Sequence, residues 1–344
     1  MMIESFFAWY NGLTDGLIGS LFLFVVGVFL LIKGGDWFVD SAAGIAKRFR
    51  VPEIIIGATV VSIGTTLPEV MVSVTAAVNN NGAIAYGNAI GSIICNTALI
   101  AALTIAIRPI PINRKTIVTP VLFFFASAAI YMVAAYVFNS FDRWLGIVML
   151  FVFAAYMAMT VYKGFKNPEN QESKEEEPEE KGGSVIKDLI LLIISAALIA
   201  VGADMLEGSS VSLATMAGIP TEVVGVTVVA LCTSLPELVT AVTALVKGHG
   251  ALSLGNIIGA NIFNLVLVSG AATTISPFVV PEGSKLMGFN TSQLFEIPLM
   301  VVVMALMTLP ALAKGKLRRW QGITLLCIYG IFVLLQVLIA VKVI

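Results

Sequence analysis

The most regular feature of the chain is a series of ten apolar segments, each close to the length of about 20 residues that crosses a bilayer as a helix. In the first half these segments lie at 17–40, 53–78, 84–107, 116–138 and 143–162. In the second half they lie at 186–207, 222–246, 251–275, 293–313 and 319–341. The pattern predicts an all-α integral membrane protein with ten transmembrane helices.

A polar segment, 163–185, separates the two groups of five helices. It contains the run Glu-Glu-Glu-Pro-Glu-Glu at 175–180, followed by Gly182 and Gly183. A segment of this composition cannot bury enough apolar surface to fold by itself. We therefore predict a first unit over 1–162, an acidic cytoplasmic linker over 163–185 and a second unit over 186–344.

The basic residues fall mainly on one side of the predicted membrane. If the chain starts outside, the inner loops hold 16 of the 20 lysines and arginines, and the outer positions hold Arg143, Lys285 and Lys342. Cytoplasmic loops carry such an excess in membrane proteins. We expect both termini to be extracellular or periplasmic, and the short loops are typical of a prokaryotic plasma membrane protein.

Composition excludes several functions. Hydrophobic residues make up 58% of the chain and charged residues only 12%, and the net charge of -1 provides no field that would attract nucleic acid. The three cysteines, Cys95, Cys232 and Cys327, lie singly in apolar stretches, so we expect packing roles. The single histidine, His249, is expected to be solvated in a short inner loop. One histidine provides neither a metalloprotease motif nor a serine-histidine pair, so an intramembrane hydrolase is disfavoured.

The two halves contain an internal repeat. Residues 51–99 align without a gap with residues 219–267, a shift of 168, and 22 of 49 positions are identical. Five helices separate equivalent positions, and because five is odd, the two copies must cross the membrane in opposite directions. Inverted repeats that meet at the membrane midplane are typical of secondary transporters.

Each copy places a glutamate inside a membrane helix, directly after a proline. The first copy reads Gly-Thr-Thr-Leu-Pro-Glu and ends at Glu69, and the second reads Cys-Thr-Ser-Leu-Pro-Glu and ends at Glu237. Helical spacing puts Thr65, Thr66 and Glu69 on one face, beside carbonyls that Pro68 would free. A carboxylate at this depth costs about 2.5 to 3.5 kcal/mol to insert, so such residues usually mark a site. Thr233, Ser234 and Glu237 repeat the cluster.

The next helix of each copy carries amides. Residues 87–92 read Gly-Asn-Ala-Ile-Gly-Ser, and steps of four place Asn88, Ser92 and Asn96 on one face. The equivalent helix has Asn256 and Asn264. Buried amides need hydrogen-bond partners, and a bound cation would satisfy their oxygens. The glycines of these motifs are expected to allow close helix packing.

The candidate ligands are all oxygens of carboxylate, hydroxyl or amide groups. Such hard ligands suit calcium, magnesium or sodium, and calcium accepts six to eight oxygens in flexible geometry. Two carboxylates would neutralise one divalent ion. We predict a calcium site at Glu69, Glu237, Thr65 and Thr233, with Asn88, Asn256 and Ser73 as further candidates.

These motifs resemble the alpha-repeats of the calcium/cation antiporter superfamily, most closely its prokaryotic sodium/calcium exchanger branch. The resemblance covers nearly the whole chain. It implies an antiporter that exchanges Ca²⁺ for Na⁺ as transported ions, with no other cofactor. It also implies that helices 17–40 and 186–207, which carry the matched Asp36 and Asp204, move against a four-helix core. The ligands it implies are Thr65, Thr66, Glu69, Ser92, Asn96, Thr233, Ser234 and Glu237.

The chain departs from this family pattern at two positions. Ala260 and Asn264 stand where sodium/calcium exchangers often carry serine and aspartate. One hydroxyl and one carboxylate are therefore missing, which leaves proton or lithium coupling open beside sodium. A cation channel could use the same oxygen ligands and is kept as a less favoured alternative.

Overall fold

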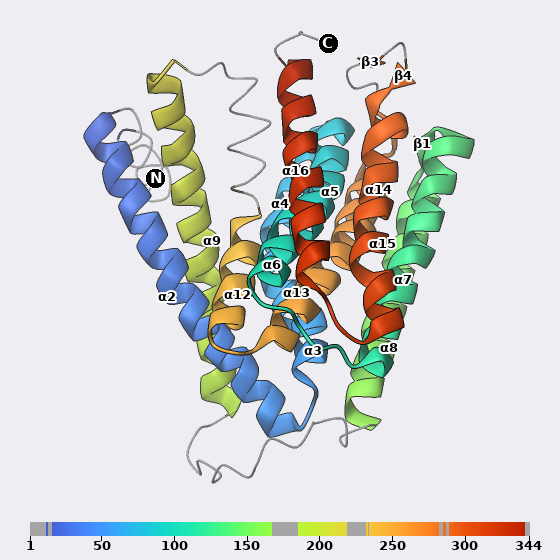
Figure 1. Cartoon of the computed structure of the whole chain (residues 1–344). Coiled ribbons are helices and arrows are strands. Elements are labelled where there is room, and N and C mark those ends of the chain that lie inside the picture. The colour runs from blue at the N-terminus through green and yellow to red at the C-terminus, as the bar shows by residue number, and fades with distance from the viewer. Residues whose placement is uncertain are drawn as a thin grey trace.

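The computed structural model describes residues 12, 16–166, 185–218, 232, 234–281, 285–286 and 289–340. Nearly all of them are helical (Figure 1). The first half contains α2 (Leu17–Phe49), α3 (Glu53–Ile56), η1 (Gly57–Val61), α4 (Ser62–Val78), α5 (Gly82–Cys95), η2 (Asn96–Ala101), α6 (Ala102–Ile107), α7 (Arg114–Val133), η3 (Ala134–Phe138), β1 (Ser140–Phe141) and α8 (Arg143–Lys166). The second half contains α9 (Val185–Met216), α12 (Leu235–Val246), α13 (Gly250–Phe263), η6 (Asn264–Val268), α14 (Ser269–Ile275), β2 (Phe278–Val279), β3 (Lys285–Leu286), β4 (Phe289–Asn290), η7 (Ser292–Glu296), α15 (Ile297–Lys314) and α16 (Arg319–Ala340).

Nine helices in the described part of the chain are long and apolar enough to cross a membrane. Most of their boundaries lie within three residues of those predicted from hydropathy. The tenth predicted helix, 222–246, is represented by α12, because residues 219–231 and 233 lie outside the described part. The all-α prediction is therefore confirmed.

Two of the helices extend well beyond the predicted segments. Helix α2 continues to Phe49 and α9 to Met216, although the apolar runs suggested ends near 40 and 207. Asp36 and Asp40 therefore lie inside α2 and not near its end. Lys247, at the C-terminal end of α12, lies 3.4 Å from the Asp36 carboxylate and 2.8 Å from the Asp40 carboxylate.

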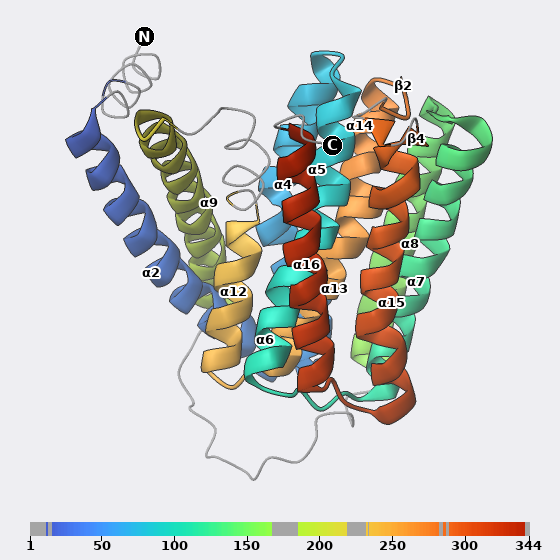
Figure 2. The same ribbon diagram turned by 45° about the horizontal axis from the view of Figure 1, so that its top comes forward.

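Burial separates central helices from peripheral ones. The segments 82–107 and 250–275, which carry the asparagine motifs, are 72% and 89% buried over their most apolar windows, whereas the corresponding window of α16 is 11% buried. The views in Figures 1 and 2 agree that α13 lies inside the bundle and that α2 and α9 stand together at one side. The repeated motifs therefore form the centre of the protein.

Helices α2 and α9 form a close antiparallel pair. A Cβ atom on Gly27 would lie 2.8 Å from the carbonyl oxygen of Gly202, and one on Gly202 would lie 2.9 Å from the carbonyl oxygen of Gly27. Gly34 packs in the same way on Ser195 and Ile199. Because a shift of 168 relates Gly27 to Ser195 and Gly34 to Gly202, the two contacts are equivalents across the repeat. Small residues of this kind let membrane helices approach closely.

Short backbone pairings connect the ends of the two halves. Strand β1 pairs antiparallel with β2, with Ser140 opposite Val279, and β3 pairs with β4. At the opposite end of the bundle, Pro111 and Lys316 form an isolated bridge. The β1–β2 pairing and the Pro111–Lys316 bridge join loops of the two halves, whereas β3 and β4 are neighbours in the sequence.

Candidate cation site

The two motif glutamates lie in the centre of the protein on α4 and α12. Glu69 is 1% exposed and Glu237 is fully buried. The two carboxyl groups are close enough to interact electrostatically, and the hydroxyls of Thr65 and Thr66 lie beside Glu237. The structure therefore brings together the residues that sequence spacing placed on two separate helices.

The local helix geometry differs between the two glutamates. Helix α4 runs continuously through Pro68, so Glu69 lies near its middle. Helix α12 begins at Leu235, and Glu237 lies in its first turn, directly after Pro236. A helix N-terminus carries a partial positive charge that favours a carboxylate. The two equivalent glutamates therefore lie at different positions in their helices, one near the middle and one in the first turn.

The asparagines are positioned by short stretches of π-helix. Asn96 begins η2 and Asn264 begins η6, and in both cases an α-helix precedes the wider turn. Such π-bulges occur frequently at functional sites because they re-aim side chains and loosen the backbone hydrogen-bond ladder. Sequence spacing predicted neither segment.

Buried polar atoms in this region lack hydrogen-bond partners among the described residues. They belong to three pairs of equivalent positions. These atoms are the carboxylate oxygens of Glu69 and Glu237, the amide atoms of Asn96 and Asn264, and the hydroxyls of Thr66 and Ser234. Burying an unpaired polar group costs about 1 to 3 kcal/mol, and a charged group costs more. Such a cluster is expected where a ligand completes the hydrogen-bonding and charge balance.

Other candidates form a network around this cluster. Thr65 donates to the Asn256 amide oxygen at 3.2 Å, and the Asn256 nitrogen donates to Thr240 at 3.0 Å. Asn88 donates to the Glu69 carbonyl at 3.1 Å and to Ser73 at 2.9 Å. Asn88 and Asn256 therefore hold the motif helices together, a positioning role that differs from the ligand role considered for them.

The remaining predicted residues are also placed by the structure, with one exception. Ser92 is 3% exposed on α5, one turn before Asn96. Thr233 lies outside the described residues. The sequence interpretation missed two neighbours of the site, Thr240 and Cys95, whose thiol lies beside Ser234 and accepts a hydrogen bond from Tyr329 at 3.7 Å. The position of Cys95 next to Asn96 was the available signal.

His249 lies in the short loop between α12 and α13, as expected, and it also has a partner that the sequence did not indicate. Its Nδ1 atom lies 2.7 Å from Glu53 at the start of α3, and both side chains are about one-third exposed. The hydrogen bond with Glu53 raises the pKa of His249 above its usual value. The pair therefore connects the first turn of one motif helix to the corner that precedes α13.

Together, the buried carboxylates at equivalent repeat positions and the central crossing helices define a membrane cation transporter and not an enzyme. Residues 19–162 and 187–338 match the family model described as sodium/calcium exchanger protein. The chain belongs to this family of cation exchangers.

Individual relatives agree with that assignment. The chain is 34% identical to an uncharacterised membrane protein of Methanocaldococcus jannaschii, over 91% of this chain and 96% of the relative. It is 31% identical to the sodium/calcium exchanger MaX1 of Methanosarcina acetivorans, over 91% and 97% of the two chains. It is 34% identical to the inner membrane protein YrbG of Escherichia coli, over 74% and 79%.

A solved structure has the same fold. The sodium-calcium exchanger NCX_Mj, in crystals soaked with Na⁺ and Sr²⁺, superimposes with a TM-score of 0.76 at 33% identity, over 92% of this chain and 98% of that chain. The sequence-based family assignment is therefore confirmed.

Proposed function

We propose that this protein exchanges Ca²⁺ for Na⁺ by alternating access, with both ions bound in turn between Glu69 and Glu237. The observation that carries the proposal is the set of buried, unpartnered oxygens at equivalent positions of the two halves. Carboxylate, hydroxyl and amide oxygens suit calcium and sodium. The names of the relatives MaX1 and NCX_Mj support the same pair of ions.

Charge explains why binding would be coupled to transport. Two buried carboxylates without a counter-ion are expensive to carry through the membrane, whereas a bound divalent ion or competing monovalent ions would neutralise them. The site would therefore cross between the two membrane faces only when it is loaded. This restriction is what converts a binding site into an exchanger.

We infer that α2 and α9 move as a unit during this cycle. They pack on each other through the reciprocal glycine contacts described above, and both are longer than the other helices. We further infer that both termini are extracellular, because this orientation places 16 basic residues inside.

A second coupling ion has specific support. Asn264 supplies a neutral amide where such exchangers often have a carboxylate, and Ala260 supplies no hydroxyl. Protons could discharge Glu69 and Glu237 without needing those ligands. Exchange of Ca²⁺ for H⁺ is therefore the alternative function.

The test is uptake of radioactive calcium into proteoliposomes loaded with sodium, compared with potassium-loaded vesicles and with an imposed pH gradient. We expect uptake that requires internal sodium and is abolished by Glu69→Gln and by Glu237→Gln. Asp142→Asn is the matched control, because it makes an equivalent change in an exposed loop. Uptake driven only by the pH gradient would favour the alternative, and full uptake by both glutamine variants would refute the site.

A further inference from the structure

A second polar site lies away from the glutamates, at the end of the bundle proposed to be cytoplasmic. It is a pocket of about 80 Å³ between α3, α7 and α8. Lys115, Thr116 and Thr119 from the first two turns of α7 face Thr160 and Lys163 from the last two turns of α8. None of the described residues that line the pocket is acidic.

The polar lining is suited to an anion. The Lys163 ammonium donates to the Thr119 hydroxyl at 2.7 Å, which leaves two of its three donor hydrogens for a ligand. Thr160 is 4% exposed, and its buried hydroxyl has no hydrogen-bond partner in the described part of the chain. Lys115 adds a second positive charge, and the N-terminus of α7 adds a partial one.

The other wall of the pocket is apolar. Ile54, Ile55 and Ala58 of α3 and η1 line it together with two prolines. A pocket that combines cations at the membrane surface with an apolar wall fits a molecule that has both a phosphate and an acyl chain. Basic pockets of this kind between transmembrane helices bind lipid headgroups.

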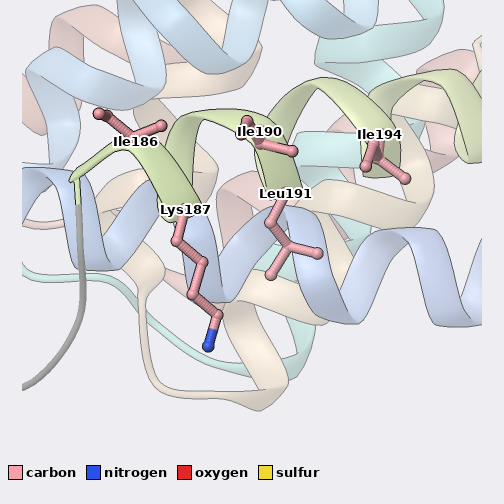
Figure 3. Close-up of a pocket in the computed structure, with 5 residues that line it drawn as sticks. All are labelled: Ile186, Lys187, Ile190, Leu191 and Ile194. Atoms are coloured by element: carbon pink, nitrogen blue, oxygen red, sulfur yellow. The ribbon is translucent and has the colours of Figure 1, made fainter.

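We propose that this pocket binds the phosphate headgroup of an anionic phospholipid from the cytoplasmic leaflet, with the acyl chains against Ile54 and Ile55. A hollow of about 360 Å³ on α9 provides a contrast (Figure 3). All five of its lining residues belong to that one helix, and only Lys187 among them is polar. It has the character of ordinary lipid-facing surface.

The lipid would touch a segment that supports the cation site. The pocket wall, α3 and η1, continues into α4, which carries Glu69, and it packs against α13. The Tyr156 hydroxyl of α8 donates to the Ala58 carbonyl in this wall at 3.1 Å. A headgroup that bridges α7 and α8 would therefore brace the start of the first motif helix.

The test measures lipid binding to the full chain in detergent by native mass spectrometry, with phosphatidylglycerol and phosphatidylcholine as probes. Each lysine near an anionic lipid contributes about fivefold in affinity, so we expect Lys115→Ala with Lys163→Ala to weaken phosphatidylglycerol binding about 25-fold. The matched control is Lys314→Ala with Lys316→Ala, which removes two exposed lysines at the same end of the bundle. We expect that control to change affinity less than twofold.

A second lipid, two single variants and competition with phosphate identify the ligand. Phosphatidylcholine binding is expected to be weak and equal in all variants. Lys163→Gln, which removes the charge but keeps a polar hydrogen-bond donor, and Thr160→Val, which keeps the shape of the side chain, should each weaken phosphatidylglycerol binding severalfold in a folded protein. Equal phosphatidylglycerol binding by the wild type and all pocket variants would overturn the proposal. Displacement of the lipid by millimolar inorganic phosphate would also overturn it, in favour of a free-anion site. None of these binding measurements depends on transport, so failure of the lipid proposal can be distinguished from failure of the proposed exchange function.

Discussion

The packing of α13 against α3 and η1 can be tested with a single added methyl group. A Cβ atom on Gly255 would collide with the carbonyl oxygen of Ile54 and would lie 2.9 Å from its carbonyl carbon. Ordinary contacts of this type begin at 3.4 Å, so Gly255→Ala must separate the two backbones by at least about half an ångström. Neither neighbour is a flexible side chain that could move aside.

The magnitude follows from comparison with a glycine that has space around it. Gly330 lies in an exposed part of α16, and a Cβ atom there would meet no described atom within 4 Å. Alanine gains roughly 0.5 to 1 kcal/mol over glycine in a helix interior at both positions. Overpacking costs about 1 to 3 kcal/mol at Gly255 only. The difference between Gly255→Ala and Gly330→Ala should therefore be about 1 to 3 kcal/mol.

The assay is unfolding of both variants in mixed micelles by titration with denaturing detergent, with calcium uptake measured in parallel. Gly255→Ala should also reduce uptake, because the adjacent Asn256 is bonded to Thr65 at only 3.2 Å and would be drawn away. If the two alanine variants unfold with free energies equal within about 0.5 kcal/mol, the close packing of α13 on α3 is refuted.

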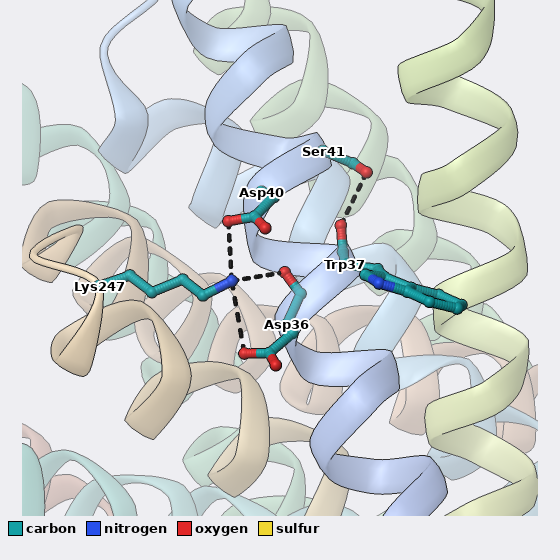
Figure 4. A network of polar contacts seen from close by, with 5 residues as sticks. All are labelled: Asp36, Trp37, Asp40, Ser41 and Lys247. Carbon is teal, nitrogen blue, oxygen red and sulfur yellow. Dashed lines mark hydrogen bonds and ion pairs between the residues drawn. The ribbon is translucent and has the colours of Figure 1, made fainter.

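Three other predictions concern two partly exposed ion pairs and calcium binding at the buried cluster. Lys247→Met should speed backbone amide hydrogen exchange in residues 36–49 up to about fivefold. Exposed ion pairs such as that of Lys247 with Asp40, at 2.8 Å, contribute about 0.2 to 1 kcal/mol each (Figure 4). High salt should produce the same faster exchange in the wild type. The stabilisation from the His249–Glu53 pair should be present below the unfolded pKa of His249, about 6.5, and be lost as pH rises through its raised folded pKa. The free energies of unfolding of the wild type and His249→Gln should therefore become equal above the folded pKa. Asp40 and Lys247 are the other charged groups that act on His249. Calcium at 100 times its Kd should stabilise the wild type by about 2.7 kcal/mol in the same unfolding assay and leave Glu237→Gln unchanged.

The sequence predicted most of the membrane topology because its signals are local. Hydropathy placed the helix that contains Glu69 at 53–78, which is the range described. It failed at α2 and α9, whose ends extend beyond their apolar runs. Those extra turns are stabilised by contacts between distant segments, such as Arg48 with Asp188 at 2.7 Å, and a hydropathy window does not detect them.

The candidate site was predictable to a similar extent. The repeat identified Glu69, Glu237, Asn96 and Asn264 as equivalent residues, and all four are buried. The π-turns at the two asparagines were not predictable, because they add one residue per turn without a distinctive sequence. The part played by Thr240 was also missed, because its equivalent in the first repeat is Val72 and symmetry gave no signal.

By itself, the sequence determined that the chain crosses a membrane many times, that its halves are repeats of opposite direction and that each half carries one buried acid. Periodicity and hydropathy are properties of neighbouring residues, so they can be read along the chain. Only the tertiary structure decided which oxygens remain unpartnered, that Lys247 connects α2 to the core and that two lysines from different helices share one pocket. These facts depend on distances between residues far apart in the chain, which helix packing alone sets.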